Sequence, residues 1–151
     1  GVITIHRKMF RFNPVKFQAH KDWRAGLPPG FSMQLIDGQL AQRNPAYQPL
    51  LDPTSQRFGF CLMEGETVAC ECTAVFVGDN EAEIDVHTEE VYRGRGFARL
   101  TACAFIEECL QRGLTPNWAC WPEREASWKL ALKLGFEELP DVPAVLWAED
   151  L

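Results

Sequence analysis

The hydrophobic pattern of this chain changes its period between Thr88 and Gly96. Residues 57–88 are rich in β-branched and aromatic side chains, and two short turns divide them. Residues 96–112 instead place apolar side chains on one helical face, and Gly113 provides a stop. The change predicts three consecutive antiparallel strands that lead directly into a helix.

The segments on either side complete an α/β pattern. The predicted strands cover residues 31–36, 57–63, 67–77, 81–88, 115–121, 136–141 and 144–148, of which the last two are expected to form a hairpin, and the predicted helices cover residues 96–112 and 122–134. A polar region with Pro45 and Pro53 is expected to form short helices and loops. This order is typical of a single domain in which helices pack against a mixed sheet.

The junction itself is a basic, glycine-rich loop. Gly94 and Gly96 let the backbone approach a ligand closely, and the helix that begins there presents free N–H groups and its positive dipole end. Arg93, Arg95 and Arg99 add full charges. The dinucleotide fingerprint G-x-G-x-x-G is not met, because Arg99 stands at the third small position, and no Gly-Lys-Ser/Thr is present. The loop therefore predicts a ligand that carries a diphosphate.

Two motifs in order make this prediction more specific. The loop sequence Arg93-x-x-Gly96-x-Ala98 resembles the acetyl-CoA signature of the GNAT superfamily of N-acetyltransferases, (Gln/Arg)-x-x-Gly-x-(Gly/Ala). Residues 126–136, a predicted helix that ends in Gly-Phe, resemble the later segment of the same family. The resemblance implies the GNAT fold, a mixed and mostly antiparallel central sheet flanked by helices, with splayed parallel strands at the acetyl-CoA cleft.

The resemblance also bears on domain organisation. It covers residues 28–148, and the run from residue 83 to residue 118 is similar to an uncharacterised bacterial GNAT subgroup in which an additional N-terminal domain commonly precedes the catalytic one. We therefore expect residues 1–27 to be a flanking segment, a remnant of or link to such a domain, and residues 28–151 to form the acetyltransferase domain. On this view the chain is the C-terminal part of a longer protein or a shortened relative.

Acetyl-CoA is the co-substrate that the resemblance implies. The residues expected to bind it are Val86, His87, Thr88, Arg93, Gly94, Arg95, Gly96, Phe97, Ala98, Arg99, Arg124 and Ser127. The backbone of residues 86–88 would pair with the pantetheine arm like another strand, and the amides of residues 93–98 would hold the pyrophosphate. An N–H of the Thr88 region would bind the thioester oxygen, although Thr88 also fits a plain strand end.

A catalytic base is useful for this reaction. An amine with a pKa of about 10.4 is mostly protonated at pH 7, and forming its free base costs roughly 4.6 kcal/mol. Glu83, Asp85 and His87 alternate onto one face of the strand. Glu83 resembles the strand glutamate that is the base in some family members, and histidine side chains titrate near neutral pH. Glu83 is the first candidate, His87 the second and Asp85 the third, with a solvated role open for each.

Two positions depart from the family pattern. The tyrosine that often protonates the departing CoA thiolate is replaced by Ala131, and the only tyrosines of the chain are Tyr47 and Tyr92. The asparagine often found three residues before the serine is replaced by Arg124, which cannot accept a hydrogen bond as an amide does. The general acid therefore stays open, and Arg124 could instead reach a CoA phosphate.

The sequence around the cysteines predicts reduced thiols in the core. All six lie in apolar strand-like or helix-like contexts, which is typical of buried thiols. Cys70 and Cys72 could suggest zinc, but no second Cys or His pair stands at ligand spacing. We therefore expect neither disulfides nor a metal.

Charge and hydropathy set limits on partners. The net charge is −6, and the basic residues concentrate in residues 1–24. The acidic remainder favours a cationic substrate such as an amine, and the chain has no broad basic stripe for nucleic acid. No apolar run approaches the roughly 20 residues of a membrane span, and no signal peptide is evident. We expect no nucleic-acid or membrane partner and a cytoplasmic location.

These residues together predict an N-acetyltransferase. It would move acetyl from acetyl-CoA to a primary amine, on a small molecule or a peptide, by direct attack in a ternary complex without a metal. The alternative is a non-catalytic acyl-CoA sensor or docking domain, which Ala131 and the basic N-terminal segment favour. A homodimer is left open, and so is the identity of the acceptor.

Overall fold

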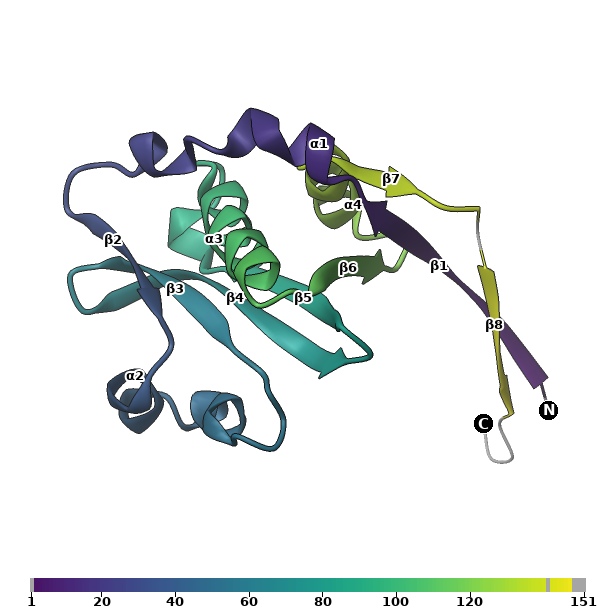
Figure 1. Cartoon of the computed structure of the whole chain (residues 1–151), viewed down its shortest axis with the longest axis horizontal. Coiled ribbons are helices and arrows are strands. Elements are labelled where there is room, and N and C mark those ends of the chain that lie inside the picture. The colour runs from purple at the N-terminus through teal and green to yellow at the C-terminus, as the bar shows by residue number, and fades with distance from the viewer. Residues whose placement is uncertain (1, 141, 148–151) are drawn as a thin grey trace.

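The computed structural model describes the backbone of residues 2–140 and 142–147 and the side chains of residues 6–140 (Figure 1). Its strands are β1 (Val2–Phe12), β2 (Phe31–Leu35), β3 (Gly59–Glu64), β4 (Thr67–Gly78), β5 (Glu81–Thr88), β6 (Thr115–Cys120), β7 (Phe136–Glu138) and β8 (Val142–Trp147). Its helices are α1 (Pro14–Phe17), α2 (Gly38–Arg43), α3 (Phe97–Gln111) and α4 (Glu125–Lys133), with short 3-10 helices η1 (Gln18–His20), η2 (Trp23–Gly26), η3 (Pro45–Leu51) and η4 (Glu90–Tyr92). The predicted three-strand meander and the helix after it are confirmed.

The described strands form one mixed sheet in the order β2-β3-β4-β5-β6-β1-β7, and β8 pairs with β1. Every pair is antiparallel except β5 with β6. Figure 1 shows α3 over the middle of this sheet and the β1–β8 ribbon extending away from the body. The α/β class and the mixed, mostly antiparallel sheet that the resemblance implied are confirmed.

The start of one helix and the pairing of the last two strands differ from the sequence predictions. The helix expected from Pro122 begins at Glu125, because residues 122–124 form a turn in which the Pro122 carbonyl accepts the Trp128 indole N–H (3.1 Å). The last two strands do not pair with each other as a hairpin. Both pair with β1, whose 11 residues are enough to serve β8 and β7 one after the other.

The N-terminal strand is part of the sheet. β1 pairs with β6 from Lys8 opposite Cys120 to Phe10 opposite Trp118, and Phe10 and Phe12 are buried in the core. The division into a flanking segment of residues 1–27 and a domain of residues 28–151 stays a prediction. Residues 2–12 are nevertheless joined to the sheet by hydrogen-bonded pairing, which the sequence analysis did not foresee.

Helix α3 lies at the centre of the main core. Phe105, Ile106 and Cys103 are fully buried on it, and burying a side chain such as Phe or Ile stabilises the fold by about 1.5–3 kcal/mol. The Phe105 ring stacks on Phe58 at 4.8 Å between centroids. At the helix surface, the Glu107 carboxylate accepts hydrogen bonds from Trp23 and Arg24, which fixes η2 on α3.

All six cysteines are buried and none forms a disulfide, so the predicted reduced core thiols are confirmed. Burial raises the pKa of the Cys72 thiol well above its ordinary value and that of the Cys103 thiol to about 12. Both thiols therefore stay neutral near pH 7. Among the described residues, no helix has the length and apolar character of a membrane span.

Candidate functional site

Strands β5 and β6 pair only over a short distance. Their parallel pairing runs from Glu81 opposite Thr115 to Glu83 opposite Asn117. Beyond that point the structure records no pairing of β5 with β6, although β5 continues to Thr88. The sheet is therefore open along the second half of β5, which agrees with the splayed parallel strands that the resemblance implied.

The register of β4 on β5 decides which backbone groups face this opening. Glu89 donates its N–H to the Ala69 carbonyl (2.9 Å), and the antiparallel alternation makes His87 the next β5 residue that hydrogen-bonds to β4. Thr88 lies between His87 and Glu89, and Val86 lies on the other side of His87, so the backbone groups of Val86 and Thr88 point away from β4. These two residues, and not His87, turn their backbone N–H and C=O groups toward the opening.

The basic loop has the geometry that phosphate binding requires. Gly94 and Gly96 have φ angles of +78° and +79°, and a Cβ at either would meet no atom within 4 Å. Gly96 is the N-cap of α3 and supplies no side chain, so the N–H groups of Phe97, Ala98 and Arg99 have no side-chain cap. The loop thus leaves an open space in front of several unbonded donors.

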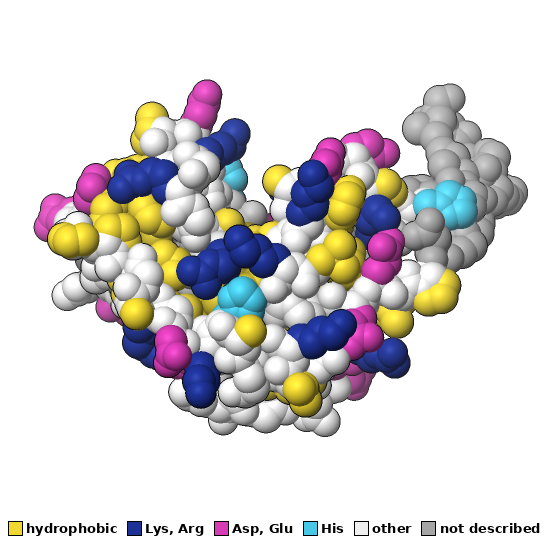
Figure 2. All heavy atoms as spheres, turned by 90° about the horizontal axis from the view of Figure 1, so that it is seen from above, with side chains coloured by type: hydrophobic (Ala, Val, Ile, Leu, Met, Phe, Trp, Pro, Cys, Tyr) yellow, Lys and Arg dark blue, Asp and Glu magenta, His cyan; other side chains and the backbone are white. Residues whose placement is uncertain are grey.

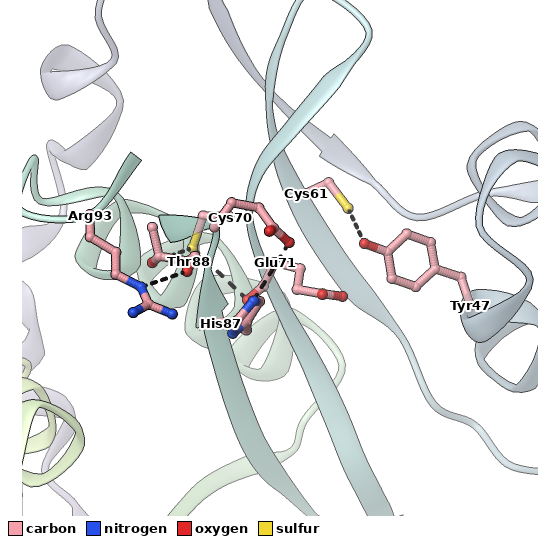
Figure 3. Close-up of polar contacts among 8 residues, drawn as sticks. Tyr47, Cys61, Cys70, Glu71, His87, Thr88 and Arg93 are labelled. Atoms are coloured by element: carbon pink, nitrogen blue, oxygen red, sulfur yellow. Dashed lines mark hydrogen bonds and ion pairs between the residues drawn. The ribbon is translucent and has the colours of Figure 1, made fainter. Parts of the chain in front are cut away.

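The three arginines of the loop differ in position. The Arg93 Nε donates to the Thr88 carbonyl (3.2 Å), which holds the guanidinium at the end of β5 (Figure 3). The Arg95 guanidinium lies over the Phe97 ring at 4.7 Å. Arg99 turns toward His20, with 3.4 Å between Arg99 Nη1 and His20 Nδ1. Only Arg93 therefore directs its charge along the opening.

A pocket of about 460 Å³, called the first pocket below, lies at this opening. It is lined by Val86, His87, Thr88, Tyr92, Arg93, Gly94, Gly96, Phe97, Ala98, Trp118, Arg124, Ala126, Ser127 and Leu130. The residues predicted to bind acetyl-CoA all line it except Arg95 and Arg99. Figure 2 shows one face of the molecule hollowed in the middle, with Lys and Arg side chains gathered along the hollow.

A second pocket, of about 250 Å³, adjoins the first. The two share Val86, Trp118, Arg124 and Ser127, and the second adds Arg7, Val75, Glu83, Ile84, Asp85, Ala119, Cys120 and Trp121. Between them, the Trp118 indole N–H donates to the Ser127 hydroxyl (3.0 Å) and joins β6 to α4. The structure therefore places two adjoining pockets where β5 and β6 separate.

The three candidate bases divide between these pockets. Glu83 and Asp85 line the second pocket and His87 lines the first. Glu83 is half-buried, with 4.0 Å between its Oε1 and Arg7 Nη2. The His87 ring is about half exposed and lies 3.5 Å from a Glu89 carboxylate oxygen. The shared strand face expected from the sequence is observed, but these side chains do not meet at one point.

The side chain of Thr88 points into the fold. Its Oγ1 lies 3.3 Å from Cys70 Sγ, on the side of the sheet that α3 covers (Figure 3). The hydroxyl therefore does not face the opening, and only the backbone N–H of Thr88 is placed for the oxyanion role. That role stays a prediction.

Residue 131, where the family often has a tyrosine, carries no side chain that could donate a proton. Ala131 is fully buried, and Tyr47 lies in a separate core cluster with Cys61, where burial raises the pKa of its hydroxyl. Tyr92 lines the first pocket and donates its hydroxyl to Glu64 (2.8 Å), a hydrogen bond that raises the pKa of Tyr92. Among the described residues, no group of His, Cys, Asp and Glu side chains could hold a metal ion.

Arg7 is a residue of the second pocket that the sequence did not predict. Arg7 reaches it from β1, and its guanidinium carbon lies 5.2 Å from the centre of the Trp121 ring. The basic residues Arg7 and Arg11 alternate along β1 with the buried Phe10 and Phe12, which is a strand signal. That alternation could have predicted β1, but nothing local indicates that β1 lies beside β6.

The chain is similar in sequence to known acetyltransferases. A family model described as GNAT acetyltransferase matches residues 2–142. Over 146 residues the chain is 34% identical to an uncharacterised N-acetyltransferase, YdfB of Bacillus subtilis, and the match covers 91% of this chain. It covers 54% of YdfB, so the chain spans about half the length of this curated relative.

Solved structures agree with the fold. The chain superposes on a GCN5-related N-acetyltransferase-like protein from Streptococcus suis with a TM-score of 0.75 and 28% identity, covering 98% of this chain and 63% of that one. A GCN5-related N-acetyltransferase from Kribbella flavida gives a TM-score of 0.69 at 12% identity, over 96% of this chain and 59% of that one, and shows the fold alone.

Proposed function

Because this chain belongs to the GNAT acetyltransferase family, we propose that it transfers an acetyl group from acetyl-CoA to a primary amine. The observation that carries the proposal is the first pocket. Free N–H groups at the start of α3 suit the pyrophosphate, and the backbone of Val86 and the N–H of Thr88, which point away from β4, suit the pantetheine arm. The amine would approach through the second pocket, which adjoins the first at Trp118 and Ser127.

The proposed reaction is one direct displacement in a ternary complex. The amine lone pair attacks the thioester carbonyl carbon and forms the C–N bond. The C–S bond then breaks, and CoA leaves as a thiolate that takes up a proton, while the new amide loses the proton of the amine. The Thr88 N–H is assigned to the oxygen that becomes negative, and losing one such donor typically costs about 3 kcal/mol of barrier.

We assign the proton of the attacking amine to Glu83, with His87 as the second candidate and Asp85 as the third. Glu83 is the more enclosed of the two carboxylates in the second pocket and lies at the point where β5 and β6 separate. No side chain is assigned as the acid, because Ala131 is buried and the Tyr92 hydroxyl already donates to Glu64. The CoA thiolate would take its proton from water. A cytoplasmic location and a homodimer stay predictions.

Two measurements test this function. Isothermal titration calorimetry should show that acetyl-CoA binds, and a thiol reagent should detect CoA released when a primary amine is added. Glu83→Gln should retain acetyl-CoA binding and lose CoA release. His87→Ala should lose less of the CoA release than Glu83→Gln. Absence of acetyl-CoA binding would exclude the proposal, and full turnover by both variants would exclude both assignments of the base.

A second function has one observation in its favour. Ala131 is buried where many family members have a tyrosine acid, which suits a domain that binds acyl-CoA without turning it over. Such a sensor would bind acetyl-CoA and release no CoA with any amine. The same two measurements separate it from the enzyme.

A further inference from the structure

The second pocket contains charges of both signs within a small volume. Arg7 and Arg124 line it together with Glu83 and Asp85, and the Trp118 and Trp121 rings and Val75 form apolar parts of its wall. The four charges balance, two positive and two negative; Arg7 and Glu83 are partly buried, whereas Asp85 and Arg124 are exposed. A ligand that carries one charge of each sign can bind here without leaving a net charge in the pocket.

The pair of Arg7 and Glu83 leaves hydrogen-bonding capacity unused. Their closest N and O atoms are 4.0 Å apart, whereas charge-assisted hydrogen bonds between such groups are usually about 2.7–2.9 Å. The Arg7 Nε is also buried and has no hydrogen-bond partner in the described part of the chain. Its guanidinium is held in position by the Trp121 ring, 5.2 Å away. The Arg7 guanidinium is thus held in position while part of its hydrogen-bonding capacity is unused.

From this arrangement we propose that the acceptor is an α-amino acid with an apolar side chain. Its carboxylate binds Arg7, its ammonium binds Glu83, and its side chain packs against Trp121 and Val75. The proposal rests on the acetyl-transfer function above and names the substrate class of the same site. Arg124 lies at the boundary of both pockets and adds positive charge beside the carboxylate.

Charge balance favours such a zwitterion over the simpler alternatives. A plain amine that binds Glu83 brings a second positive charge next to Arg7, and a plain carboxylic acid brings a second negative charge next to Glu83. A zwitterion supplies one new partner to each side chain without changing the total charge of the pocket. In an α-amino acid both groups are attached to one carbon, so a single small molecule can meet two side chains that lie 4.0 Å apart.

Binding to the CoA-loaded protein tests the proposal directly. L-leucine and L-phenylalanine are titrated beside the amines that lack the carboxylate, 3-methylbutylamine and 2-phenylethylamine, and beside the matching acids that lack the ammonium. Each amino acid should bind at least about tenfold more tightly than either counterpart, because it gains one charge-assisted interaction. Equal or tighter binding of the amines, or no binding by any of the six compounds, would overturn the proposal.

Variants then locate the carboxylate partner. Arg7→Gln should remove the preference of an amino acid over its amine, and Arg7→Lys should restore part of it by keeping the charge. Arg11→Gln is the matched control, because Arg11 lies four residues along the same strand, is exposed and does not line the second pocket. An undiminished preference in Arg7→Gln would overturn the role of Arg7.

The same titrations distinguish the two proposals. They begin with CoA alone, and retained CoA binding in each variant shows that the fold is intact. Binding of the amino acids without binding of CoA or acetyl-CoA would exclude the proposed function and support the amino-acid site. Release of CoA from acetyl-CoA with the plain amines as readily as with the amino acids would support the function and exclude the amino-acid site.

Discussion

The two pockets meet at Trp118 and Ser127 but are built from different parts of the polypeptide. Nine of the fourteen residues that line the first come from one short stretch, residues 86–98, and its uncapped hydrogen-bond donors are backbone N–H groups at the start of α3. The second collects residues from β1, β4, β5, β6, the turn after β6 and α4, and its charged groups are the side chains of Arg7, Glu83, Asp85 and Arg124. A backbone site binds any ligand with the right phosphate geometry and changes little when side chains change. A side-chain site can change its ligand by single substitutions.

The strongest test of this contrast is the loss of one side chain from the second pocket. Glu83→Gln removes the proposed base, so kcat near neutral pH should fall by about 100-fold or more, which is the usual contribution of a general base. Acetyl-CoA affinity should not change, because Glu83 does not line the first pocket. Thiol release at saturating acetyl-CoA and calorimetry measure the two effects. If His87→Ala causes the larger loss, the base belongs to the first pocket.

A backbone substitution should have the largest effect on the first pocket. Gly96→Ala forces a side chain into a φ of +79° and puts a Cβ in the open space before α3. Losing two backbone contacts to phosphate should weaken acetyl-CoA binding about 100-fold. Gly113→Ala is the control, since Gly113 follows the other end of α3 with a φ of +71°. Both variants should lose about 1–2 kcal/mol of stability, so equal losses of affinity would contradict a backbone-built site.

A side chain of the first pocket should matter less than its backbone. Arg93→Gln removes one guanidinium at the end of β5, and acetyl-CoA binding should weaken by roughly tenfold and depend less on salt. Arg95→Gln should weaken acetyl-CoA binding less than Arg93→Gln, because the Arg95 guanidinium lies over the Phe31 and Phe97 rings. Calorimetry at low and high ionic strength measures both. An Arg93 effect larger than that of Gly96→Ala would make the first pocket a side-chain site as well.

The smallest effect is expected outside both pockets. The hydrogen bond from Arg24, together with that from Trp23, lowers the pKa of Glu107 below its ordinary value of 4.5. A carboxyl whose pKa is lower in the folded state stabilises the fold above its unfolded pKa, and this contribution disappears as pH falls through the folded pKa. Glu107→Gln should therefore lower the Tm slightly at pH 7 and flatten its fall below about pH 4.5, measured by thermal scans. Unchanged acetyl-CoA binding at pH 7 is the control.

The same contrast explains what could be predicted from the sequence. Much of the first pocket could be predicted because nine of its residues lie within residues 86–98, and a strand end, two glycines and a helix start have chemical meaning without knowledge of the rest of the chain. The side chains of Arg95 and Arg99 do not line this pocket and instead turn to aromatic rings and to His20. A loop sequence defines the backbone path but not which rotamer finds a better partner nearby.

The second pocket could be predicted only in part. The alternation of Glu83 and Asp85 along one strand face followed from the strand period, and the structure agrees. Arg7 was missed because it is 76 positions from Glu83 in the chain, and only the pairing of β1 with β6 brings the two within 4.0 Å. Strand order in a sheet depends on the packing of the whole core around α3. No local pattern in residues 1–24 carries that information.

The hydrogen bond from Trp118 to Ser127 has a thermodynamic consequence, because both residues belong to the walls of both pockets. A ligand that shifts this bond in one pocket changes the wall of the other. Whatever factor acetyl-CoA applies to the affinity for the acceptor, the acceptor must apply to the affinity for acetyl-CoA. Ser127 thus connects the two proposed binding equilibria, and their coupling free energy is the same whichever ligand binds first.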